Sequence, residues 1–173
     1  SVIYVQNLTD IDDDILKKAK EVGRDWGELG KYWTKLFLKD LKTLNIRMPD
    51  HYVRATDAID EIILITQKLL HEGLAYEVSG NVYFSRKMFA EYGKLSRYTE
   101  KQMQLTASER GGNISDKKKK DPLDFLLWQK SRPEDDQPLA EHEPSWDSPW
   151  SKGRPGWHIE CSAMIQQHLG TQI

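Results

Sequence analysis

The residues with the clearest chemical potential lie near the carboxyl end of the chain. Cys161 is the only cysteine in the 173-residue sequence, and Trp157 precedes it by four positions. Apolar residues continue at the same spacing with Ile165 and Leu169, which predicts a helix with these residues on one face. The spacing therefore places a sulfur one helical turn from an indole ring.

A turn is predicted immediately before this helix. Pro155 and Gly156 favour a turn, and proline suits the first position of a helix. Cys161 would then lie in the early turns, where unpaired backbone N–H groups and the helix dipole favour a thiolate. The sequence thus offers a sulfur that could bind a metal ion or act as a nucleophile.

Spacing alone also allows a plainer interpretation of this helix. A single cysteine beside a tryptophan is more typical of core packing than of chemistry. A zinc site needs about four ligands, and no second cluster stands at ligand spacing. The histidines are scattered along the sequence, at His51, His71, His142, His158 and His168.

Acidic residues crowd a segment near the amino end. Asp10, Asp12 and Asp14 have the spacing of a calcium loop, but Ile15 occupies the position where such a loop needs glycine. Apolar residues from Ile11 onward follow a helical period instead. We expect Thr9 to cap this helix, with the carboxylates in its first turn near the positive end of the dipole.

The remaining elements follow from periodicity and turn residues. Residues 2–5 predict a buried strand, 25–43 a helix with a buried apolar stripe, and about 56–71 a third helix. Strands are expected at 74–78 and 82–85 around a hairpin turn, a helical turn at 88–92, and a strand at 125–128. Residues 96–120 and 131–145 show no period and are expected to be loops.

Composition excludes several classes of protein. The net charge of −2 gives no global basic field for binding DNA, and no apolar run is long enough for a membrane span. The N-terminus does not resemble a signal peptide. A single cysteine excludes an internal disulfide and fits a reducing compartment such as the cytoplasm. Both ends suggest cuts through a longer protein.

Four stretches, in order, resemble conserved segments of the cysteinyl-tRNA synthetases, a family of class I aminoacyl-tRNA synthetases. Residues 148–164 resemble the segment that carries a zinc-binding cysteine. Residues 4–13 resemble an Asn-x-Thr-Asp-Ile-Asp-Asp segment, and 44–56 resemble part of a helical insertion. Residues 121–130 resemble an Asp-Phe-x-Leu-Trp-Lys strand. Several motifs in one order are more specific than any one of them.

The resemblance implies an α/β fold of the Rossmann-like class I type. Residues 1–24 and 146–173 would belong to the catalytic core, with the start of a last strand at 171–173. Residues 25–145 would form an inserted connective region, mostly helical with a β-hairpin.

The resemblance also implies a chemistry. Members of the family activate cysteine with ATP and Mg²⁺ and transfer it to the matching tRNA(Cys). By analogy, Thr9 and Trp157 line the cysteine pocket and Cys161 is one ligand of a Zn²⁺ ion. A soft thiolate ligand suits zinc, which can then distinguish substrate sulfur from the oxygen of serine.

Other parts of the family's active site are not in this sequence. The family's remaining zinc ligands, its His-Ile-Gly-His motif and its Lys-Met-Ser-Lys-Ser loop have no counterpart here. No catalytic residue is therefore assigned within the chain, and we expect the isolated chain to be inactive. Two alternatives remain: a cysteine–glucosaminylinositol ligase of the same superfamily, or a non-catalytic module that docks tRNA or serves a structural role.

Overall fold

A computed structural model describes residues 2–109, 112–132 and 143–171. Strands and helices mix in it as the predicted α/β class requires. In chain order the elements are β1 (Val5–Leu8), α1 (Asp13–Val22), α2 (Trp26–Thr43), β2 (His51–Arg54), the 3₁₀ turn η1 (Ala55–Ala58), α3 (Ile59–His71), β3 (Ala75–Val78), β4 (Asn81–Phe84), the 3₁₀ turn η2 (Arg86–Met88), α4 (Glu100–Glu109), β5 (Phe125–Lys130), β6 (Gly153–Pro155) and α5 (Trp157–Leu169).

The first strand pairs with a distant strand in a short parallel sheet. β1 lies beside β2 with Val5 opposite His51 and Leu8 opposite Arg54. The predicted strand at 2–5 was placed too early, because Val2 and Ile3 lie outside this ladder and are 74% and 59% exposed. β2 falls within residues 25–145, and the boundaries of the inserted region stay a prediction. The last strand predicted at 171–173 falls largely outside the described residues.

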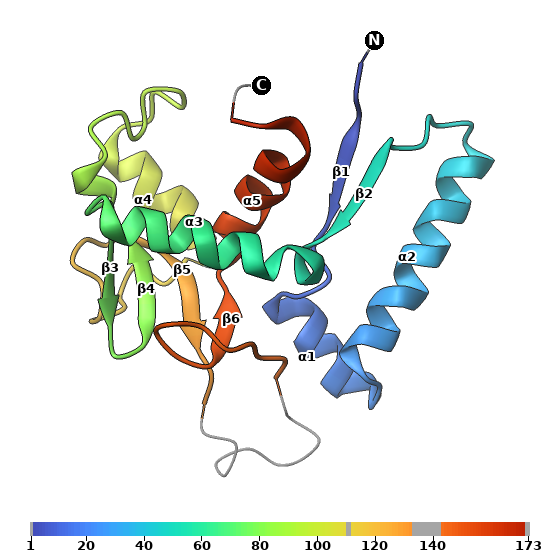
Figure 1. The fold of residues 1–173 in the computed structure, drawn as a ribbon, viewed down its shortest axis with the longest axis horizontal. Coiled ribbons are helices and arrows are strands. Elements are labelled where there is room, and N and C mark those ends of the chain that lie inside the picture. The colour runs from blue at the N-terminus through green and yellow to red at the C-terminus, as the bar shows by residue number, and fades with distance from the viewer. Residues whose placement is uncertain (1, 110–111, 133–142, 172–173) are drawn as a thin grey trace.

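A four-stranded antiparallel sheet forms the other half of the molecule, in the order β3-β4-β5-β6 (Figure 1). The predicted hairpin is confirmed, with β3 and β4 joined at Ser79 and Gly80. Both turn residues have positive φ, 54° and 82°, as a two-residue primed turn requires. The strand predicted at 125–128 is also confirmed and extends to Lys130.

Two helix starts show how capping was predicted and where it differs. Asp25 caps α2 as expected, accepting a 2.9 Å hydrogen bond from the backbone N–H of Glu28. The cap of α1 is Asp12 rather than Thr9, since the Asp12 carboxylate accepts a 2.7 Å bond from the N–H of Ile15. Thr9 lies three residues before the cap and is free to serve another purpose.

The apolar stripe predicted to be buried along α2 is mostly open. Leu29 and Leu41 are buried, but Trp33 and Leu44 are 53% and 67% exposed. In Figure 1, α2 stands at one side of the molecule and runs alongside β2. The period of the stripe correctly predicts a helix, whereas burial requires a neighbouring element on that side.

The segment 96–120 contains a helix that we expected to be a loop. α4 spans Glu100–Glu109 and has no buried residue, so its sequence shows no apolar period. Its start does carry a local signal. The Thr99 hydroxyl accepts from the Gln102 N–H at 3.3 Å, and the Gln102 side chain accepts from the Thr99 N–H at 2.9 Å. This reciprocal pair is a capping box.

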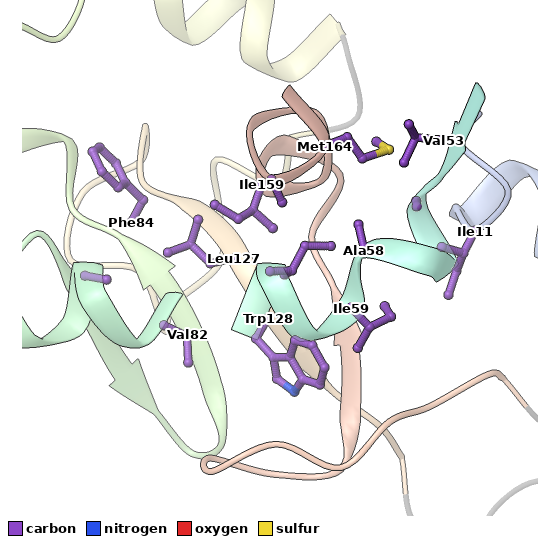
Figure 2. Close-up of a cluster of buried hydrophobic side chains, with 14 residues drawn as sticks. Ile11, Val53, Ala58, Ile59, Val82, Phe84, Leu127, Trp128, Ile159 and Met164 are labelled. Carbon is purple, nitrogen blue, oxygen red and sulfur yellow. The ribbon is translucent and has the colours of Figure 1, made fainter. Parts of the chain in front are cut away.

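One hydrophobic cluster joins the two halves of the molecule. Figure 2 shows Ile11 and Val53 from the parallel half and Leu127 and Trp128 from the antiparallel sheet, with side chains of α3 and α5 between them. Ile159 of α5 is 4% exposed at this junction. The shared core therefore fixes α5 relative to both β1 and β5, which brings the two ends of the sequence together.

Candidate functional site

The start of α5 lies tightly against the antiparallel sheet. Gly156 is the N-cap of α5, and its N–H donates a 3.0 Å hydrogen bond to the Leu127 carbonyl. A Cβ at this glycine would lie 2.1 Å from the Leu126 carbonyl oxygen, so no larger residue fits without movement. Pro155 belongs to β6 and is not the first helical residue, contrary to our expectation. Strand pairing, rather than proline, determines where this helix begins.

The predicted helical face that carries Trp157 and Cys161 points away from the core. Trp157 is 50% exposed and Cys161 is also exposed. The buried face of α5 consists of Ile159, Glu160, Ala163 and Met164. Core packing, the plainer interpretation of the tryptophan and cysteine, is therefore wrong, and both side chains are accessible to a ligand.

Thr9 and Cys161 meet at a single side chain from β1. The Asn7 amide nitrogen lies 3.3 Å from the Thr9 hydroxyl and 3.7 Å from the Cys161 sulfur, and it donates to both. The structure thus brings together two predicted site residues that are 152 positions apart in the sequence. Sequence reasoning missed Asn7. Its position two residues before Thr9 in a strand was the available signal, since alternate strand residues share a face.

The segment that carries Thr9 is pinned from below. The Asp10 carboxylate accepts hydrogen bonds from the Thr56 hydroxyl at 2.6 Å and from the Thr56 N–H at 3.1 Å. Asp12 is used as the cap of α1. These contacts fix the backbone on both sides of Ile11, which is itself 1% exposed. The acidic residues of this segment therefore hold the loop in place, in agreement with our rejection of a calcium loop.

The thiol of Cys161 is not activated by its position on the helix. Partial burial raises the pKa of the Cys161 thiol above its usual value, and the neighbouring Glu160 raises it further. The expectation that the helix N-terminus favours a thiolate is therefore wrong for this chain. Desolvation outweighs the dipole at this position, so the sulfur keeps its proton until a cation replaces it.

Glu160, which the sequence did not single out, is the most unusual charged residue near the site. Its side chain is 1% exposed, and its Oε2 has no hydrogen-bond partner among the described residues. Burial raises the pKa of Glu160 to about 8, and the nearby carboxylates of Asp10 and Asp12 add to this rise. Glu160 is therefore mainly protonated at neutral pH, and it adds little charge beside Cys161.

Cys161 has the chemistry of one zinc ligand, a sulfur donor at an open surface. Within the described part of the chain, no three His, Cys, Asp or Glu side chains come together in a way that could hold a metal ion. These residues thus fit one donor of a metal site and not a complete one. Across residues 2–109, 112–132 and 143–171, no helix is both long and apolar enough to cross a membrane.

Comparison with known proteins places this site in a family. The description "tRNA synthetases class I (C) catalytic domain" matches residues 1–173. The chain belongs to this family of class I tRNA synthetase catalytic domains, which confirms the resemblance seen in its motifs.

Curated relatives match the chain almost from end to end. It is 47% identical over 174 aligned residues to a cysteine–tRNA ligase of Trichodesmium erythraeum, covering 99% of this chain and 34% of that protein. A cysteine–tRNA ligase of Pyrococcus furiosus is 46% identical, covering 98% and 33%. An L-cysteine:1D-myo-inositol 2-amino-2-deoxy-alpha-D-glucopyranoside ligase of Thermomonospora curvata is also 46% identical, covering 98% and 39%. The chain therefore spans between a third and two fifths of the length of these relatives.

Proposed function

We propose that the full-length protein is a cysteine–tRNA ligase that activates cysteine with ATP and Mg²⁺ and transfers it to tRNA(Cys). The observation that carries the proposal is the meeting of Thr9 and Cys161 at the Asn7 amide. That arrangement leaves a hydroxyl, an amide and a thiol facing a common opening, with Trp157 one helical turn away. Such a set can surround a small polar amino acid. The cytoplasm, where the cysteine is kept reduced, is the proposed location.

Each predicted site residue has a physical role in this proposal. Cys161 would hold zinc as one of its ligands, with the remaining ligands supplied from outside the described residues. The ion supplies a soft Lewis acid that prefers a thiolate to a hydroxyl, which shape alone separates poorly. Thr9 and Asn7 orient the substrate by hydrogen bonds. The Trp157 ring closes one wall and excludes water.

The test is cysteine-dependent exchange of pyrophosphate into ATP by the full-length protein, with serine as the matched control. We expect turnover with cysteine and far less with serine. Replacing Cys161 by Ser should lower the zinc content of the full-length protein and weaken discrimination between the two amino acids. Zinc content measured after dialysis separates a metal ligand from a merely structural thiol. The isolated 173-residue chain should show no exchange. No role for DNA is proposed.

A second function is supported by a specific observation. The relative that ligates cysteine to a glucosamine-inositol is as similar to this chain as the cysteine–tRNA ligases are. The Asp-Phe-Leu-Leu-Trp strand within a long insertion favours the tRNA ligase, as our motif analysis suggested. Offering the full-length enzyme either tRNA(Cys) or the glucosamine-inositol, after activation of cysteine, distinguishes the two acceptors.

A non-catalytic role in docking tRNA is the remaining alternative for the isolated chain. A gel shift with tRNA(Cys) over a range of salt concentrations tests it, since phosphate contacts weaken steeply with salt. Binding by the isolated chain without any activity of the full-length protein would support this alternative over the ligase.

A further inference from the structure

A row of aromatic rings runs from the antiparallel sheet to the start of α5. Phe84 of β4 stacks on Phe125 of β5 with ring centroids 4.9 Å apart, and Phe125 lies 4.5 Å from the His158 ring. His158 in turn stacks on Trp157 at 3.7 Å, with 26° between the ring planes. The indole that forms a wall of the proposed cysteine pocket therefore rests on a ring that is itself supported by the inserted region.

His158 acts in this row as an uncharged ring. Desolvation lowers the pKa of His158 to about 4, and the nearby Lys119 lowers it further. At neutral pH the imidazole therefore carries no proton that would require a counter-ion. A neutral ring with an open π-face stacks on indole as other aromatic rings do.

Trp157 needs such support because it has room to move. A cavity of about 550 Å³ separates the inserted segment from the start of α5, and its lining includes Tyr92, Tyr98, Lys119, Trp157 and His158. With 50% of Trp157 exposed, the packing of the core does not fix its rotamer. Ring stacking can shift a rotamer population about tenfold at most, which is enough to decide whether the wall stands in place.

We propose that His158 is a positioning residue, which together with Phe125 holds the Trp157 ring in place as a wall of the cysteine pocket. The inserted region thereby sets the shape of the pocket, although none of its own residues need contact the amino acid. The inference rests on the proposed function. It concerns the placement of the tryptophan and assigns no chemical step to the imidazole.

The test uses the full-length enzyme in pyrophosphate exchange. The His158→Ala variant should raise the KM for cysteine about fivefold to tenfold, the range that a ring-stacking contact supports. The kcat and the KM for ATP should stay within about twofold of the wild type, since neither depends on this wall. His158→Phe, which keeps a flat ring, should restore the KM for cysteine. Phe125→Leu should raise it in the same direction, and serves if His158→Ala fails to fold.

A matched control and three outcomes make the result decisive. Tyr98→Ala removes an exposed ring from the same cavity and should leave the KM for cysteine unchanged. If His158→Phe is as impaired as His158→Ala, the imidazole nitrogens act directly and the proposal is overturned. An equal rise in the KM for ATP, or an unchanged KM for cysteine in His158→Ala, overturns it as well. A wild-type enzyme without cysteine-dependent exchange contradicts the proposed function instead, before any variant is compared.

Discussion

Two buried carboxylates, one in each half of the molecule, have opposite surroundings. Asp124, which precedes β5, accepts hydrogen bonds from the Tyr76 hydroxyl at 2.7 Å, the Arg86 N–H at 3.0 Å and the Asp121 N–H at 3.0 Å. Glu160 of α5 is equally inaccessible, 1% exposed like Asp124, yet its Oε2 has no partner among the described residues. Burial alone thus says little about what a charged side chain does.

The difference separates scaffold from site. In the antiparallel sheet, buried polar groups such as Asp124 and Asn81 tie strands and loops together, as is typical of a structural core. Around α5 and β1 the same chain leaves a protonated glutamate buried, a thiol open and an indole half exposed. Groups that are costly or idle in the fold gather where a ligand could use them.

The largest expected effect comes from breaking the satisfied carboxylate. Asp124→Ala removes the acceptor for three donors and leaves them buried, so we expect a loss of about 4 kcal/mol in the free energy of unfolding. Urea denaturation monitored by circular dichroism measures this loss. Asp147→Ala, at an exposed position, is the control and should change stability by less than about 0.5 kcal/mol. A loss below about 1 kcal/mol for Asp124→Ala would mean that the network does not stabilise the sheet.

A smaller loss should follow from separating the two halves where they join. Gly156→Ala forces a Cβ to within 2.1 Å of the Leu126 carbonyl oxygen, so α5 must move away from β5. Crowding of this kind costs about 3 kcal/mol. The midpoint of urea unfolding should fall accordingly, and exposure of Trp157 should change with it. An alanine variant as stable as the wild type would show that the start of α5 can shift without cost.

The unsatisfied carboxylate should respond to pH with the opposite sign from a salt-bridged one. The folded chain raises the pKa of Glu160 from 4.5 to about 8, so between these values the folded state holds a proton that the unfolded state has lost. Stability contributed by this proton is present at low pH and declines as pH rises towards 8.

Glu160→Gln should remove this dependence because the amide stays neutral. We expect the variant to be more stable than the wild type by on the order of 2 kcal/mol at pH 8, with the gap closing towards pH 5. Thermal unfolding at a series of pH values measures the gap. Glu77→Gln, at an exposed strand position, is the matched control. Equal pH profiles for Glu160→Gln and the wild type would show that Glu160 titrates normally.

The smallest expected effect is a gain, in the sparsely packed α2. Gly30 lies inside this helix, and an added Cβ would meet only Ile15 Cδ1 at an ordinary 3.9 Å. Gly30→Ala should therefore stabilise the chain by about 0.5–1 kcal/mol, the difference in helix propensity. Paired with Gly156→Ala in the same unfolding assay, it contrasts a glycine required by close approach with one that is not. A loss of stability in Gly30→Ala would indicate tighter packing of α2 than these distances imply.

The sequence by itself determined features that depend on a few neighbouring residues. Asp25 and Glu28 predicted the start of α2, and Ser79 with Gly80 predicted the hairpin, because caps and turns form within one or two turns of chain. Thr99 and Gln102 carried an equally local signal for α4 that apolar periodicity could not show. The family motifs identified Thr9, Trp157 and Cys161 together, although each residue alone allowed a plainer interpretation.

Only the tertiary structure decided which faces are buried and which distant residues meet. The period of α2 predicted a helix but not that Trp33 would be open to solvent. Asn7 contacts Cys161, and the rings of Phe125 and His158 stack, because the shared core brings β1, β5 and α5 together. Burial and long-range contact depend on elements that arrive from far along the chain, and no local pattern of residues encodes their arrival.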